Sequence, residues 1–184
     1  MNLYVAGDSY CADRTDPDAH WPAILAQLLG LQLQGAGFPG LGWWPVRQNL
    51  EQYLRTTPAK NTTHWIFCHT DPHRPITDHR LSELSQRAWV GEIHNTLVSN
   101  WCATQWYQEL NGWLQGQQVI HLICYPHSAT SSLVGYQRPT PLFELAKESA
   151  GNQTEFLNHV PNHFCGNYNQ RLAQELAQTI GQIF

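Results

Sequence analysis

The chain has 184 residues, of which 42% are hydrophobic and only 13% charged, and its formal net charge is −4. This length suits one domain with a full core, and the absence of a Lys/Arg run argues against binding to nucleic acid or to an anionic membrane. No apolar stretch approaches the roughly 18–20 residues that cross a bilayer, and no signal-peptide pattern opens the chain. We therefore expect a cytoplasmic protein with no membrane segment.

Strand-like and helix-like apolar patterns alternate along the chain. In chain order they predict a strand over 2–7, a helix from Trp21 to Gly30, a short strand over 31–35, a helix over 44–54, a strand over 64–68, one or two helices over 81–114, a strand over 119–124 and an amphipathic helix over 168–183. Residues 126–158 look irregular, with a short helical pattern over 143–147.

This alternation predicts a parallel sheet with helices on both faces. We expect an α/β protein: a three-layer α/β/α sandwich around a central sheet of about five parallel strands. Neither a flexible linker nor an internal repeat divides residues 1–184. The chain is therefore expected to form a single domain.

Four polar segments follow predicted strands or precede the last helix. They are Gly7-Asp8-Ser9-Tyr10, the glycine turn over 35–42, Cys68-His69-Thr70-Asp71, and residues 158–163. Open α/β folds bind ligands at the carboxyl edge of the sheet, where such segments meet. We therefore expect a site built from these segments.

In this order the segments resemble the SGNH (GDSL-type) serine hydrolases, and the chain looks like a divergent, small bacterial or phage-like member. That family carries a Ser in Gly-Asp-Ser, a glycine turn after the second strand, Gly-x-Asn-Asp after the third, and Asp-x-x-His before the last helix. The resemblance spans essentially the whole chain, and only the first block matches closely. It implies a flavodoxin-like SGNH hydrolase fold and a carboxylic-ester hydrolase.

The resemblance also implies roles for individual residues. Ser9 is the implied nucleophile, and the backbone N–H groups of Ser9 and Gly40 with the Thr70 hydroxyl would hold the oxyanion. The implied base is His163, which lies ten residues before Ala173 in the last helix. His159 is the alternative base.

Two positions depart from the family pattern. Val160 stands three residues before His163, where the family has an orienting Asp, so Asn162, Asp71 or a backbone carbonyl would have to orient the imidazole, or the site would use a Ser–His dyad. Thr70 replaces the family's oxyanion asparagine, and its hydroxyl can still donate one hydrogen bond. These departures predict slow hydrolysis of generic esters.

Two other functions remain open from the residues. One is a non-catalytic SGNH-like module that binds a glycan or protein partner through its cleft and exposed tryptophans. The other is a metal-dependent phosphoesterase, because His69-x-Asp71-x-His73 has metal-ligand spacing, although Pro72 interrupts it. We expect no metal and no cofactor, a small-molecule or carbohydrate ester as substrate, and leave the oligomeric state open.

The five cysteines are an odd number without a C-x-x-C pair, which argues against a disulfide framework. Cys11, Cys68 and Cys165 each lie two residues from a candidate site residue. We therefore expect these three thiols near the site, and no such link for Cys102 and Cys124.

Overall fold

The computed structural model describes residues 1–12, 20–38, 42–57, 62–71, 96–149, 164 and 167–183. Within them one parallel sheet has the strand order β2-β1-β3-β4-β5. Its strands are β1 (Asn2–Gly7), β2 (Gln32–Gln34), β3 (Thr62–His69), β4 (Val119–Ile123) and β5 (Tyr136–Gln137). This is the flavodoxin-like doubly wound order, so the predicted α/β class and parallel sheet are confirmed.

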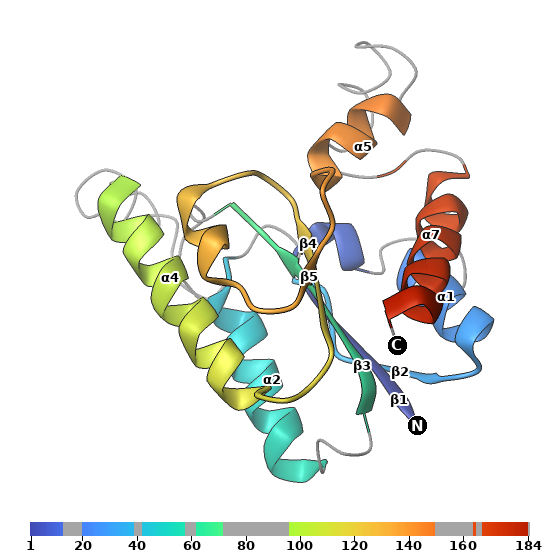
Figure 1. The fold of residues 1–184 in the computed structure, drawn as a ribbon, viewed down its shortest axis with the longest axis horizontal. Helices are drawn as coiled ribbons and strands as arrows, with labels where there is room; N and C mark the ends of the chain where they lie inside the picture. Colours follow the sequence, from blue (N-terminus) through green and yellow to red (C-terminus); the bar gives the residue numbers. More distant parts are fainter. Residues whose placement is uncertain are drawn as a thin grey trace.

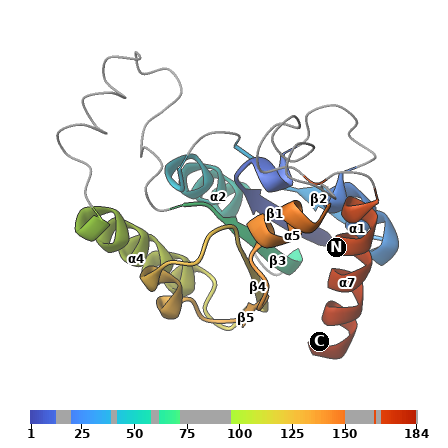
Figure 2. The ribbon, with the colours of Figure 1, turned by 90° about the horizontal axis from the view of Figure 1, so that it is seen from above.

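Helices cover both faces of the sheet (Figures 1 and 2). On one face α1 (Trp21–Leu29), α5 (Leu142–Ser149) and α7 (Tyr168–Ile183) contribute to one core cluster. On the other face α2 (Trp44–Thr56) and α4 (Thr96–Trp113) contribute to a second cluster. The three layers predicted from the sequence are therefore present.

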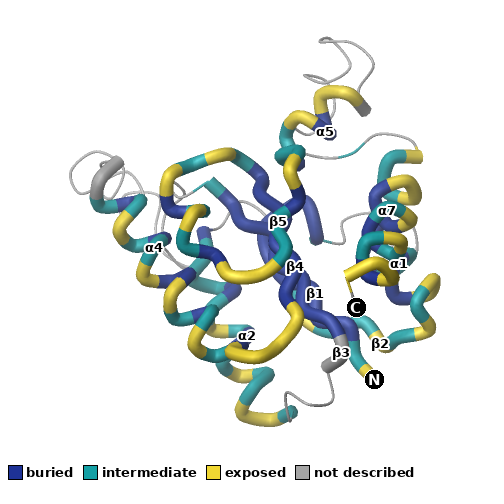
Figure 3. Tube along the Cα trace, in the orientation of Figure 1, coloured by how far each residue is buried: buried dark blue, intermediate teal, exposed yellow. Residues whose placement is uncertain are grey.

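The central strands are buried on both faces, as Figure 3 shows. Along β1, Leu3 and Val5 enter the cluster under α1 and α7, whereas Tyr4 and Ala6 enter the cluster under α2 and α4. Alternate residues of a strand point to opposite faces, and burial on both requires a continuous apolar run. This requirement explains why the strands appear in the sequence as unbroken apolar segments.

The ends of α1 follow from local sequence signals. Pro22 lies in the first turn, where its missing N–H costs no helical hydrogen bond. Gly30 ends the helix in the left-handed region with φ 63°, and its N–H donates to the carbonyls of Ala26 and Gln27. The predicted boundaries of this helix are confirmed.

The fifth strand lies in the segment predicted to be irregular. β5 has two residues, whose pairing with β4 continues in a hydrogen bond from the Arg138 N–H to the His121 carbonyl at 3.0 Å. The buried Arg138 guanidinium binds both carboxylate oxygens of Glu175 on α7, at 2.8 and 3.0 Å. Backbone pairing and an ion pair position this strand, so no apolar pattern marks it in the sequence.

No helix among the described residues has both the length and the apolar character needed to cross a membrane. The predicted helical pattern before residue 96 lies outside the described residues.

Candidate functional site

Gly7 is the point where three of the four polar segments meet. It pairs with Cys68 on β3 and forms a parallel bridge with Gly37 after β2. Its carbonyl accepts the Phe38 N–H at 2.8 Å. Because the register aligns Gly7 with Cys68, Ser9 and Thr70 each lie two residues beyond the same pair, at the carboxyl edge of the sheet.

Ser9 begins a short 3-10 turn, η1 (Ser9–Cys11), directly after β1. The Asp8 side chain caps this turn, since its Oδ1 accepts the Tyr10 N–H at 3.0 Å. Ser9 is only 4% exposed, and no residue that the structure describes hydrogen-bonds its hydroxyl. The turn therefore holds a buried serine at the edge of the sheet.

Thr70 follows β3 and is 6% exposed. Its Oγ1 is buried and has no hydrogen-bond partner among the described residues. A buried hydroxyl left in this way costs about 1–3 kcal/mol of stability, so such groups commonly bind a ligand or water. Asp71, the next residue, is half-buried.

Gly40, His159, Asn162, His163 and Cys165 lie outside the described residues. Phe164 is described, and its ring centroid lies 5.4 Å from that of Tyr10. The residue after His163 therefore packs against the residue after Ser9.

Trp21 links the start of α7 to the serine turn. Its backbone N–H donates to Asn169 Oδ1 at 3.2 Å, and its indole N–H donates to the Tyr10 carbonyl at 2.7 Å. Trp21 thus connects two segments: the turn that carries Ser9 and the first turn of α7. The contact between Tyr10 and Phe164 lies beside this anchor.

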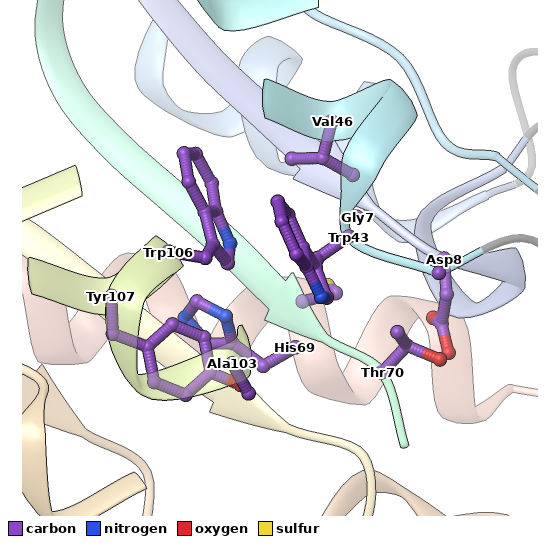
Figure 4. A pocket seen from close by; sticks show the side chains of 11 residues that line it. Gly7, Asp8, Trp43, Val46, His69, Thr70, Ala103, Trp106 and Tyr107 are labelled. Carbon is purple, nitrogen blue, oxygen red and sulfur yellow. The ribbon is translucent and has the colours of Figure 1, made fainter. Parts of the chain in front are cut away.

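A small cavity opens beside Thr70 on the side of α2 and α4 (Figure 4). Asp8, Trp43, His69, Thr70 and Tyr107 are among its lining residues. It offers about 10 Å³ to the centre of a water-sized sphere, close to the minimum for one water molecule. The Trp43 indole nitrogen is buried there without a partner in the described part of the chain.

Two buried histidines from neighbouring strands form a pair behind this cavity. His69 Nε2 lies 2.9 Å from His121 Nδ1, and His121 Nε2 lies 3.1 Å from the Val134 carbonyl oxygen. Burial lowers the pKa of His121 to about 4. Burial, followed by the proximity of His121 and His127, lowers the pKa of His69 well below its ordinary value. Both imidazoles are therefore neutral at neutral pH.

Tyr107 on α4 completes this cluster. Its ring meets that of His69 edge to face with centroids 4.7 Å apart, and its hydroxyl lies 3.2 Å from His127 Nε2. No motif in the sequence pointed to Tyr107, His121 or Trp43. The position of His121 inside the apolar run over 119–124 could have indicated a buried, hydrogen-bonded imidazole. Nothing in the sequence marked the Trp43 N–H.

This pairing bears on the metal-ligand hypothesis for His69, Asp71 and His73. His69 points onto the face of the sheet and hydrogen-bonds His121, while His73 lies outside the described residues. Among the described residues, no group of three potential ligands could hold a metal ion. His69 Nε2 therefore already has a partner, His121 on β4.

The thiols gather differently from the sequence-based expectation. The Cys11 thiol donates to the Asp8 carbonyl at 3.3 Å, and Cys68 lies close to Cys11 in the same core cluster. Cys124 also lies close to Cys68, although its position in the sequence gave no such link. All three are buried: Cys11 lies in η1, Cys68 on β3 and Cys124 directly after β4. Burial raises the pKa of the Cys68 thiol, which makes it a poor nucleophile.

The low pKa of His121 predicts acid sensitivity. In the unfolded chain a histidine titrates near 6.5, so between pH 6.5 and about 4 the unfolded state binds a proton that the folded state excludes. Stability from this group is complete above pH 6.5 and falls by about 1.4 kcal/mol per pH unit below it. In His121→Gln this part of the pH slope is expected to disappear. Urea unfolding between pH 4.5 and 8 measures it, and equal slopes in both proteins would contradict the prediction.

No family model and no curated protein sequence matches the chain. Similar solved structures include an inhibitor-bound aryl esterase of M. smegmatis, at 16% identity and TM-score 0.49, with all of both chains covered. Another is the acetyl xylan esterase Est2A of the rumen bacterium Butyrivibrio proteoclasticus, also at 16% identity and TM-score 0.49. That alignment covers 97% of this chain and 63% of the other.

Independently of these likenesses, the described residues define a class of protein. It is a doubly wound α/β domain with a buried serine turn directly after its first strand. The switch in strand order between β1 and β3 is where such folds bind ligands. Ser9 and Thr70 follow these two strands.

Proposed function

We propose that the protein is an SGNH-type serine esterase that hydrolyses an acyl or acetyl ester through a covalent intermediate on Ser9. The contact between Tyr10 and Phe164 carries this proposal. The two residues directly follow Ser9 and His163, so their packing supports a nucleophile and a base on adjoining segments. Nucleophilic catalysis requires this proximity.

In the proposed reaction, His163 takes the proton of Ser9 Oγ as the oxygen attacks the ester carbonyl carbon. The oxyanion accepts hydrogen bonds from the N–H groups of Ser9 and Gly40 and from the Thr70 hydroxyl. His163 returns the proton to the departing alcohol, and water then hydrolyses the acyl-enzyme. Support for the part of Thr70 comes from its buried hydroxyl, which has no partner among the described residues.

The proposed base needs a group that orients its imidazole. Asn162 or Asp71 would supply that group, and without one the site would work as a Ser–His dyad. His159 is the alternative base. A triad without its acidic member loses several orders of magnitude in rate and keeps its other contributions, so slow turnover is expected in the dyad form.

A second candidate function is a non-catalytic SGNH-like module that binds a glycan or protein partner. The water-sized cavity beside Thr70 favours it, because this cavity offers no room for a large acyl group. Trp101 on α4 is 64% exposed and would give such a module an aromatic contact surface.

The pH dependence of hydrolysis tests the base. We expect slow cleavage of p-nitrophenyl acetate whose rate rises with pH through roughly 6–7, because a histidine must be neutral to accept the serine proton. His163→Ala should lower kcat by about a hundredfold or more, and the matched control His159→Ala should leave it unchanged. A wild-type rate in His163→Ala would remove His163 as the base, and the reverse pattern would assign His159.

A further inference from the structure

The cavity beside Thr70 contains a hydrogen-bond donor held in a fixed position. The Trp43 ring stacks on Trp106 with centroids 6.0 Å apart and planes 9° from parallel. Its Nε1 is buried with no partner among the described residues. Figure 4 shows the two indoles side by side, with the Trp43 nitrogen directed into the space that His69 also borders.

The histidine pair leaves one acceptor nitrogen on His69, a residue that lines the same cavity. The Val134 carbonyl can only accept, so the proton of His121 is on Nε2 and its Nδ1 accepts. His69 must then donate from Nε2 to His121, which leaves His69 Nδ1 as a lone-pair acceptor. The Tyr107 and His69 rings pack edge to face, which restricts rotation of the imidazole. His69 itself lines the cavity.

We propose that Trp43 Nε1–H and His69 Nδ1 form a subsite for one hydroxyl group of the substrate. A hydroxyl accepts from the indole and donates to the imidazole, whereas a methyl group does neither. The cavity offers about 10 Å³ to the centre of a water-sized sphere, which is room for a group the size of a hydroxyl. This inference rests on the proposed esterase function and names its substrate class as hydroxylated esters.

The hydroxyl can belong to the acyl group or to the alcohol of the ester, because the cavity adjoins the candidate reaction centre. Gly7, Asp8 and Thr70 line it beside the predicted oxyanion position. A short hydroxyacyl group would place its hydroxyl there from the acyl side. A polyol or sugar would do so from the alcohol side.

Isosteric ester pairs test the subsite and separate these sources. For the acyl side, p-nitrophenyl glycolate is compared with the propionate, and 3-hydroxypropionate with the butyrate. For the alcohol side, 2-hydroxyethyl acetate is compared with propyl acetate. We expect kcat/KM to favour the hydroxylated member of one pair by at least about tenfold, because a site built for a hydroxyl rejects analogues that lack it.

Two variants identify the donor. Trp43→Phe keeps an aromatic ring and removes the N–H, so the preference should fall to about twofold or less. The matched control Trp113→Phe changes an indole on α4 outside the cavity lining and should keep the preference. Equal kcat/KM within every pair for the wild type, or an unchanged preference in Trp43→Phe, overturns the inference.

A binding measurement keeps this test independent of turnover. The indole ¹⁵N–H resonance of Trp43, assigned by its loss in Trp43→Phe, should shift on titration of the wild-type protein with glycolamide and not with propionamide. No shift with glycolamide, or equal shifts with both amides, overturns the subsite and leaves a structural water as the occupant. A third outcome is a selective shift of the indole resonance in a protein that neither hydrolyses esters nor labels at Ser9. This result overturns the proposed esterase function and keeps the subsite.

Discussion

Ser9→Ala is expected to abolish covalent labelling by a fluorophosphonate and to lower ester hydrolysis by about a thousandfold or more. The reagent reports an activated serine, and removal of a nucleophile leaves only the oxyanion and binding contributions to catalysis. Mass spectrometry of the labelled protein and p-nitrophenyl acetate turnover measure the two effects. The substitution removes one oxygen that no described residue hydrogen-bonds, so the fold should persist.

Ser99→Ala is the matched control for this experiment. Ser99 is a similarly buried serine, 5% exposed, but it lies on α4 and not in the turn after β1. It should retain full labelling and turnover. Labelling of Ser9→Ala at the wild-type level would place the nucleophile elsewhere. A wild-type protein that neither labels nor hydrolyses esters would favour the binding module.

Gly7→Ala is expected to destabilise the fold by about 3 kcal/mol or more. A Cβ at this position would overlap the Cys68 carbonyl oxygen and lie 2.5 Å from the Cys68 Cβ. Both atoms belong to the strand paired with β1, so relief requires separating β1 from β3 at the centre of the sheet. Overpacking that moves backbone reaches the upper end of single-substitution effects.

Gly112→Ala is the control for this second prediction. Gly112 lies in α4, and a Cβ there would meet nothing within 4 Å. Alanine in a helix is more favourable than glycine by up to about 1 kcal/mol, so this variant should equal or exceed the wild type in stability. Urea unfolding of the three proteins gives both differences. Wild-type stability of Gly7→Ala would show that the β1–β3 junction can move.

Local patterns were sufficient to predict most of the fold. The apolar run after Asn2, the proline and glycine that bound α1, and the periodic apolar residues of α7 each act within one element. Their alternation then led to a parallel sheet, because strands joined through helices pair in parallel. The serine turn at the end of β1 was predictable for the same reason, since strand and turn are adjacent in the chain.

The contacts made around that turn depend on tertiary structure. His69 and His121 are 52 positions apart and meet only because β3 and β4 pair. Cys124 joins Cys68, and Arg138 holds the two-residue β5, through contacts that no local pattern encodes. The sequence by itself determined which segments become strands and helices and which polar residues end them. Only packing between distant segments decided that His69, the Trp43 indole N–H and the Thr70 hydroxyl border one cavity. Hydrogen-bond partners depend on where side chains lie in space and not on their order in the chain.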